Sequence, residues 1–184
     1  VYTFLSKDEN PNRKKLLFSL ELKDAKDLKA SVLEDHLDCE QGDLPEEIFR
    51  KDLLCPRIFL EELTPYRSMI RGFFEEETKR SFAEQPERIL DYLKKNITFH
   101  PEEEYDTIMA TPVGVLTMKQ GSPLAQKILF VAICRSLNVA ARLNPVTLEP
   151  EYYRDGEFHS VETEAAVLKE ETESAVLTLR AEDG

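Results

Sequence analysis

Cysteine and long hydrophobic runs are both scarce in this sequence, and basic residues are outnumbered by acidic ones. The three cysteines, Cys39, Cys55 and Cys134, are widely spaced. They predict neither a disulfide framework nor a zinc site, and they leave the redox compartment open. No apolar run approaches the ~18 residues that would indicate a membrane span. The 36 acidic and 24 basic residues give a net charge of −12, which disfavours nucleic acid as a partner.

Glycine-rich phosphate loops and clusters of metal ligands are also missing. Arg57, Arg67 and Arg71 have no glycine-rich loop beside them, so we expect these arginines to pair with the abundant carboxylates. His36 and His100 are isolated, and no three ligands cluster as a metal would require. The sequence therefore predicts no cofactor and no metal site.

The length and composition are typical of one globular domain, with or without an appendage. A chain of 184 residues, 41% apolar and 33% charged, is long enough to bury a hydrophobic core. It begins at Val1 without a leader and stops at Gly184 without a closing element. We expect a mature product or an excised part of a longer chain, with flanking domains on the same chain.

Residues 1–40 are predicted to be the end of a β unit. Leu16, Phe18, Leu20 and Leu22 occur at every second position, which is the period of a half-buried strand. Residues 1–5 would pair with this strand across a polar turn, and residues 29–37 would form a further strand or a short helix.

Residues 41–164 are predicted to form the main domain, because the apolar period changes from strand-like to helical near residue 44. Helices are expected from residue 46, after Thr64-Pro65, and after Pro86. Residues 98–120 are expected to be a long connection, which in a compact domain is often functional. Residues 165–184 are expected to start a following β segment, with a strand at 176–179.

Residues 121–142 are predicted to be a buried helix that runs directly into a strand. Ser122 is a good N-cap, and Pro123 suits the first helical position because its missing N–H costs nothing there. Residues 128–134 are apolar without a break, which indicates a helix that is buried on every side. A strand is expected at 139–143.

Residues 152–161 contain the clearest hairpin signal, an Asp-Gly pair between two β-prone runs. With a two-residue turn of type I′, Tyr153 would face Phe158 and Tyr152 would face His159 across the two strands.

Residues 134–142, CRSLNVAAR, resemble the Arg-x-Leu-Gly-Ile-x-Ala-Arg phrase that ends the central helix of the transglutaminase-like superfamily, whose cysteine chemistry is papain-like. The resemblance covers roughly residues 90–162. Residues 56–58 (PRI) and 62–67 (ELTPYR) are similar to a phrase in degenerate domains of large envelope proteins of Bacteroides-type bacteria. The resemblance implies an α+β fold, with a central buried helix packed on an antiparallel sheet and here an N-terminal β extension. It also implies a location in the cell envelope or periplasm.

The catalytic residues of that family are not retained. Its chemistry needs a Cys at a helix N-terminus, a His as general base, and a carboxylate that orients the His. By the resemblance, the Cys falls on Pro123, the His falls near Thr147, and the Asp falls on Glu162. No histidine lies between Ile108 and Phe158, so a shifted alignment does not supply one. Losing one such residue costs several powers of ten in rate, so the resemblance implies the fold and argues against the activity.

The remaining reactive side chains favour structural roles. Cys134 lies in the apolar run of the central helix and is expected to be a buried, inert thiol. Cys55 has no histidine nearby and is expected to be a packing residue or a surface thiol. His159 is close to Glu162 in the sequence, but their odd spacing puts them on opposite faces of a strand.

We therefore predict no catalytic residue and place a candidate ligand groove at the former active site. Its residues would be Ser122, Pro123, Thr147, Tyr152 and Glu162. The leading interpretation is a catalytically inactive domain of a larger bacterial protein that binds a peptide or a glycan, or acts as a scaffold. The alternatives are a hydrolase or peptidase with a serine- or carboxylate-based site, at Ser122 or at Glu162, and a purely structural spacer.

Overall fold

The structure is a computed structural model that describes residues 2–5, 7, 10–21, 23–24, 28–100 and 110–162. The helices are α1 (Tyr2–Leu5), α2 (Asn12–Ser19), α4 (Ala30–His36), α5 (Glu46–Ile48), the π-helical η1 (Phe49–Leu54), α6 (Tyr66–Phe73), α7 (Glu76–Glu84), α8 (Glu87–Asn96), α9 (Pro112–Met118) and α10 (Pro123–Ser136). The strands are β1 (Thr98–Phe99), β2 (Gln120–Gly121), β3 (Ala141–Leu143), β4 (Pro150–Arg154) and β5 (Glu157–Ser160). The strand expected at 176–179 lies outside the described residues.

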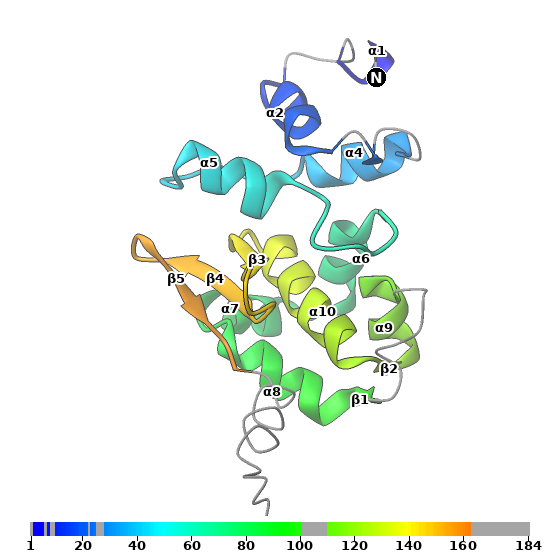
Figure 1. Ribbon diagram of the computed structural model, residues 1–184, viewed down its shortest axis with the longest axis vertical. Coiled ribbons are helices and arrows are strands. Elements are labelled where there is room, and N and C mark those ends of the chain that lie inside the picture. Colours follow the sequence, from blue (N-terminus) through cyan, green and yellow to red (C-terminus); the bar gives the residue numbers. More distant parts are fainter. Residues whose placement is uncertain are drawn as a thin grey trace, which may run out of the picture.

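Helix α10 is the centre of the fold. Ser122 caps it and Pro123 begins it, as predicted, and every residue from 125 to 136 is buried. Helices α6, α8 and α9 and strands β3 and β4 pack around it (Figure 1). Within the described residues, no helix is both long enough and apolar enough to cross a membrane.

Strands β3, β4 and β5 form an antiparallel sheet in that order. The predicted hairpin is confirmed, with Tyr152 opposite His159 and Tyr153 opposite Phe158. Both turn residues have positive φ, 53° and 91°, as a type I′ turn requires. The short strands β1 and β2 pair in parallel beside the start of α10. The expected α+β class is therefore confirmed in its coarser form, a mixed fold with a small antiparallel sheet.

The described residues form two hydrophobic clusters, and strand β4 contributes neighbouring side chains to both. Tyr152 belongs to the larger cluster, which is built around α10. Tyr153 packs against the smaller cluster, in which Leu16, Phe49 and Ala140 bring the N-terminal helices against the chain after α10. Because neighbouring strand residues point to opposite faces, two consecutive tyrosines connect the two clusters through the sheet.

The expected N-terminal β unit is wrong for the described residues, which form α1, α2 and α4. Leu16 and Leu17 pack into the smaller cluster, whereas Phe18 is 77% exposed. A short run that contains Leu16, Leu17 and Leu20 fits the helical spacing of three and four residues as well as it fits alternation. The alternation alone was therefore insufficient to distinguish a strand from a helix.

The expected long connection at 98–120 is also wrong in part, because it contains β1, α9 and β2. Thr111 caps α9 by accepting a hydrogen bond from the Gly114 N–H, and Pro112 takes the first helical position. This is the same start signal as Ser122-Pro123, but Gly114 inside the helix lowers its helical propensity.

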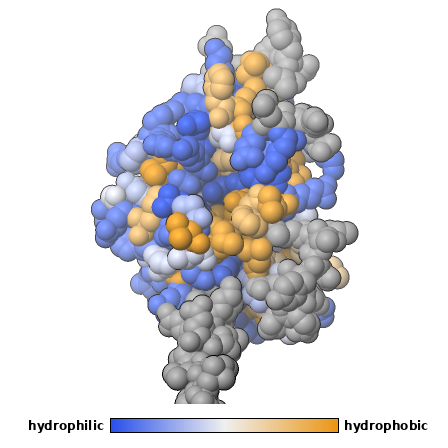
Figure 2. Space-filling view, viewed as in Figure 1, coloured by the Kyte–Doolittle hydropathy of each residue, from blue (hydrophilic) through white to orange (hydrophobic). Residues whose placement is uncertain are grey.

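Apolar side chains on the surface are dispersed over several elements. Figure 2 shows apolar surface interspersed with hydrophilic surface on one face of the molecule. The most exposed of the large apolar residues are Phe18, Leu60, Met69, Met118 and Val146, which come from five different segments. Scattered residues of this kind are normal and indicate no particular interface.

Two arginine side chains, one buried and one partly buried, connect separate elements through backbone carbonyl groups. Arg135, near the end of α10, donates to the carbonyls of Cys55, Arg57 and Ala141 at 2.8–2.9 Å. Arg71 donates to the carbonyl of Ser136, the last residue of α10. The Ser136 carbonyl is at a helix end, where carbonyls have no partner within the helix, and Arg71 satisfies it. The three carbonyls that Arg135 contacts lie after η1 and in β3.

The expectation that the arginines pair with carboxylates holds for Arg57 and Arg71, each of which contacts an aspartate. It is wrong for Arg67, whose guanidinium has no carboxylate partner among the described residues. Arg67 is completely buried and donates to the carbonyl of Leu53 in the last turn of η1. A sequence with many carboxylates predicts pairing on the surface, but it does not show which arginine is buried.

We predict that Arg135→Met lowers the free energy of unfolding by about 3 kcal/mol, because three buried carbonyls lose a charged donor. Urea denaturation followed by circular dichroism measures this loss. Arg80→Met, on the exposed face of α7, is the control and should change the free energy by less than ~0.5 kcal/mol. A loss at Arg135 as small as that of the control would contradict the role given to its three hydrogen bonds.

His36 lies at the junction between the N-terminal helices and α6. It is fully buried, its Nδ1 lies 2.8 Å from the Val32 carbonyl oxygen, and its ring meets that of Tyr66 edge-on at 4.6 Å. Burial, followed by the nearby Arg67 guanidinium, lowers the pKa of His36 well below its usual range. The imidazole is therefore neutral at neutral pH, and Nδ1 donates its proton to the carbonyl.

This burial makes the stability depend on pH in a defined direction. Below about pH 6.5, the usual pKa of His, His36 is protonated in the unfolded chain but stays neutral in the folded chain. We predict that the free energy of unfolding falls as the pH drops from there towards the lower pKa of folded His36, by up to about 1.4 kcal/mol per pH unit. His36→Asn, whose amide can still donate to Val32, should give a shallower slope in denaturation curves recorded between about pH 7 and about pH 5. Equal slopes for both proteins would refute the prediction.

Candidate functional site

The start of α10 is closed by its own cap. Ser122 Oγ accepts a hydrogen bond from the Ala125 N–H at 3.2 Å, and Pro123 is buried. Gly121 packs tightly before it, since a Cβ there would meet Ala125 and Val115 at 3.3 Å. In the part of the chain that the structure describes, no histidine or carboxylate hydrogen-bonds to the Ser122 hydroxyl. Within the described residues, therefore, no base is in place to activate this serine as a nucleophile.

Thr147 is an exposed residue of the turn between β3 and β4. Its N–H and that of Val146 both donate to Asn144 Oδ1, at 3.1 and 2.9 Å. The Thr147 hydroxyl in turn accepts from the Glu149 N–H at 3.2 Å. These local side-chain-to-backbone bonds are the usual way in which Asn and Thr stabilise a turn, so Thr147 has a structural role.

An ion pair joins α10 to this turn. Lys127 Nζ lies 2.6 Å from a Glu149 carboxylate oxygen, with the two side chains only 9% and 16% exposed. Lys127 is four residues after Pro123, so both lie on the same face of the helix. Glu149 is two residues after Thr147. A largely buried Lys–Glu pair therefore connects the two segments that carry Pro123 and Thr147.

Tyr152 and Glu162 are the last two residues of the predicted groove, and they do not hydrogen-bond to each other. The Tyr152 hydroxyl donates to the Glu87 carboxylate at the start of α8, and burial together with this bond raises the pKa of Tyr152 to about 12. Its ring stacks on His159. Glu162 is exposed, directly after the buried Val161. Among the described residues, no hydrogen bond joins any two of the five predicted groove residues, so the groove stays a prediction.

The cysteines occupy structural positions. Cys134 is buried in α10, and burial raises the pKa of its thiol. Cys55 is also buried, and its Sγ donates to the Ser19 carbonyl at 3.4 Å. Neither thiol is accessible as a thiolate nucleophile. No group of three His, Cys, Asp or Glu side chains within the described ranges could hold a metal ion.

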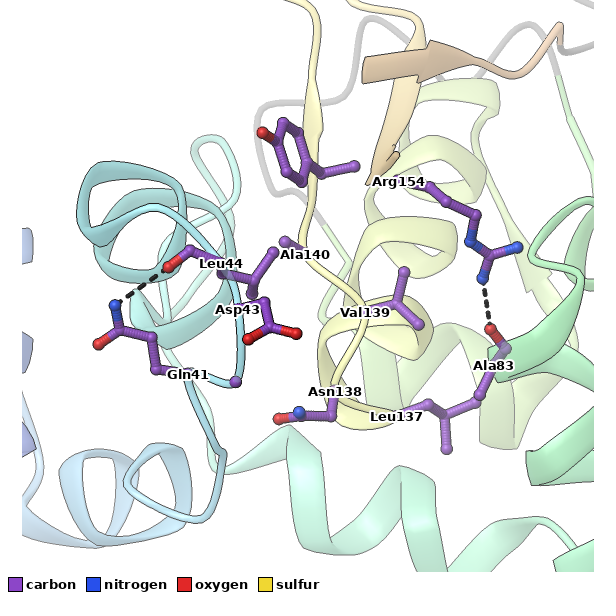
Figure 3. Close-up of a pocket in the computed structure, with 11 residues that line it drawn as sticks. Gln41, Asp43, Leu44, Ala83, Leu137, Asn138, Val139, Ala140 and Arg154 are labelled. Carbon is purple, nitrogen blue, oxygen red and sulfur yellow. Dashed lines mark hydrogen bonds between the residues drawn. The ribbon is translucent and has the colours of Figure 1, made fainter. Parts of the chain in front are cut away.

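A hollow of about 460 Å³ lies near the opposite end of α10, where the chain passes into β3 (Figure 3). It is lined by the turn at 41–44, by residues 137–140, by Ala83 at the end of α7, and by Tyr153 and Arg154 of β4. Its volume is within the range of small-molecule sites. Sequence reasoning missed this hollow, because its walls come from segments that are far apart in the chain.

The contact that closes one side of the hollow is between Asn138 and Glu40. The Asn138 side chain accepts from the Glu40 N–H at 3.0 Å and donates to the Glu40 carbonyl at 3.1 Å. Asn138 has a positive φ of 63°, a conformation that Asn tolerates better than most residues. One residue thus ends the helix and also holds the N-terminal segment 98 positions away.

Comparison with known proteins identifies the family. The model of the transglutaminase-like superfamily matches residues 67–165, which is just over half of the 184 residues. The matched segment runs from α6 past β5 and includes α10 and the hairpin. This chain therefore belongs to the transglutaminase-like superfamily, as its sequence suggested. No curated protein and no solved structure matches the chain, and the likeness to envelope proteins of Bacteroides-type bacteria stays a prediction.

The Lys127–Glu149 pair allows a direct test of what holds the start of α10 and the turn between β3 and β4 together. We predict that Lys127→Met lowers the free energy of unfolding by about 3 kcal/mol, because it removes the cation from a largely buried ion pair. The double change Lys127→Met and Glu149→Leu should recover at least half of this loss. Urea denaturation of the single and double variants measures both effects.

The control is Lys79→Met, which breaks an ion pair on α7 whose Glu76 partner is 85% exposed. Exposed pairs of this kind contribute little, and the change should stay below ~1 kcal/mol. If Lys127→Met is no more costly than Lys79→Met, the pair does not hold the turn against α10.

Proposed function

We propose that this chain is a transglutaminase-like domain without catalytic activity that acts as a binding or scaffolding module. One observation carries the proposal: the two segments on which the family places its Cys and His are here joined by the Lys127–Glu149 ion pair. Pro123 has no nucleophilic atom, and Thr147 cannot serve as a general base near neutral pH. Glu162 is the one position of the three that keeps its chemical type, and it has nothing to orient.

The cap of α10 supports the same conclusion. In the family's chemistry, the helix N-terminus lowers the pKa of the catalytic thiol. Here the first free N–H groups are partly satisfied by Ser122, and proline replaces a donor at the next position. The site has the arrangement of an ordinary helix start rather than that of an anion-stabilising one.

A binding role is supported by the hollow beside Asn138. It is concave, it has both apolar and polar walls, and it lies away from the ion pair at the other end of α10. A peptide or a glycan is the ligand class that we propose. On the sequence resemblance, we further propose that the protein works in the cell envelope or periplasm, together with flanking domains.

An assay for turnover tests the loss of catalysis. We expect no amine incorporation into a glutamine peptide and no hydrolysis of fluorogenic peptides above the uncatalysed rate. The variant for comparison is Ser122→Asn, because Asn caps a helix as well as Ser does but has no nucleophilic hydroxyl. Turnover by the wild-type protein that disappears in Ser122→Asn, with unchanged thermal stability, would establish a serine enzyme and overturn the proposal.

A thermal-shift screen with cell-wall peptides, peptidoglycan fragments and glycans tests the binding role. A ligand present at about a hundred times its dissociation constant stabilises the folded state by about 2.7 kcal/mol, which corresponds to a shift of a few degrees at this size. Tyr152→Ala and Glu162→Ala report on the predicted groove. A panel without any shift would favour a structural spacer.

A further inference from the structure

We propose that the hollow in Figure 3 binds a ligand that carries an ammonium group and a carboxylate at the two ends of an aliphatic chain, as a lysine-type side chain with a terminal carboxylate does. This inference rests on the binding role proposed above and names its ligand class.

The walls are held in place by hydrogen bonds that do not need a ligand. The turn at 41–44 is closed by the Leu44 N–H on the Gln41 carbonyl at 3.1 Å, with the Gln41 amide returning to the Leu44 carbonyl at 3.0 Å. Gly42 allows this turn because its φ is +53°, which costs glycine little. The two hydrogen bonds between Asn138 and Glu40 fix the turn against the end of α10. Because these walls are ordered before a ligand binds, binding does not carry the entropy cost of ordering them.

The floor of the hollow is apolar. Leu44 on one side and Leu137, Val139 and Ala140 on the other contribute aliphatic surface, and the Tyr153 ring borders it. Apolar surface in a concave site favours the methylene groups of a ligand, at about 25 cal/mol for each Å² that is removed from water. A ligand that is polar along its whole length would gain nothing from these residues.

The two charged side chains of the hollow carry opposite signs. Asp43 is exposed, and no ion pair or hydrogen bond of its side chain is found in the described part of the chain. Arg154 uses one N–H of each terminal nitrogen on the carbonyls of Glu84 and Ala83, at 2.6 and 2.7 Å. Since a guanidinium has five N–H groups, Arg154 keeps donors for a further acceptor. Figure 3 shows Asp43 and Arg154 on opposite sides of Val139.

These features select one ligand chemistry. We expect the ammonium group to lie beside Asp43, the carboxylate beside Arg154, and the aliphatic chain over the apolar side chains of the lining. A ligand with only one of these charges would contact only one of the two charged side chains, so both ends contribute to affinity.

Binding of ε-aminocaproate, measured by isothermal titration calorimetry, tests the inference. Hexylamine and caproate have nearly the same chain but only one charge each, and we expect each to bind about tenfold more weakly, the effect of one lost polar contact. The carboxylate end is tested through caproate and hexylamine rather than by replacing Arg154, because that arginine also holds the end of α7.

Asp43→Asn tests the wall that would contact the ammonium group. It should weaken ε-aminocaproate and hexylamine about tenfold each and leave the binding of caproate unchanged. The matched control is Asp155→Asn, which removes an exposed carboxylate from the hairpin turn outside the hollow and keeps a residue that tolerates positive φ. This control should bind like the wild-type protein.

Three results would overturn the inference. They are no saturable binding of ε-aminocaproate up to ~10 mM, equal binding of the three probes, and equal loss of affinity in Asp43→Asn and Asp155→Asn. None of them bears on the turnover assay with Ser122→Asn, so failure of this ligand class is distinguishable from failure of the proposed loss of catalysis.

Discussion

The structure depends on how the ends of its buried helices are satisfied. A helix leaves its last carbonyl groups without partners, and burial makes such groups costly. Here arginines from distant segments donate to them. Arg135 and Arg67 bond to carbonyls in and after η1, Arg71 bonds to the end of α10, and Arg154 bonds to the end of α7. Positive charge at a helix C-terminus is favourable as well, so each contact satisfies an acceptor and also complements the helix dipole.

This arrangement explains which parts of the family phrase are kept. In CRSLNVAAR the arginine that corresponds to the family's helical Arg is Arg135, which holds three carbonyls. The family's glycine is replaced by Asn138, one of the few residues that accept a positive φ there. Asn138 also gains two hydrogen bonds to Glu40 that glycine could not make. The residues that hold the fold are therefore preserved or replaced by a physically adequate residue.

Local sequence signals were sufficient to predict a helix start and a tight hairpin turn. Ser122-Pro123 defined the start of α10, and the Asp-Gly pair defined the hairpin and its register. Where the signal was a short apolar pattern, as at Leu16–Leu17, the helical and strand periods were indistinguishable and the prediction failed. The hollow and the burial of Arg67 were not predictable at all, because both depend on contacts between segments that are distant in the chain.

The residues that fix the neighbouring segments lie near the C-terminal end of α10, whereas the sequence resemblance places the family's nucleophile at the N-terminal start of this helix. At the C-terminal end, Arg135 and Asn138 fix the neighbouring segments, and a change there would expose or unpair buried groups. At the N-terminal end, a helix needs only a cap, and Ser122 provides it. A proline at the first helical position is compatible with that cap, and a largely buried Lys–Glu pair can keep the turn against the helix without any histidine. The fold is therefore under no physical constraint to keep the catalytic residues, and membership of the superfamily does not by itself require its chemistry.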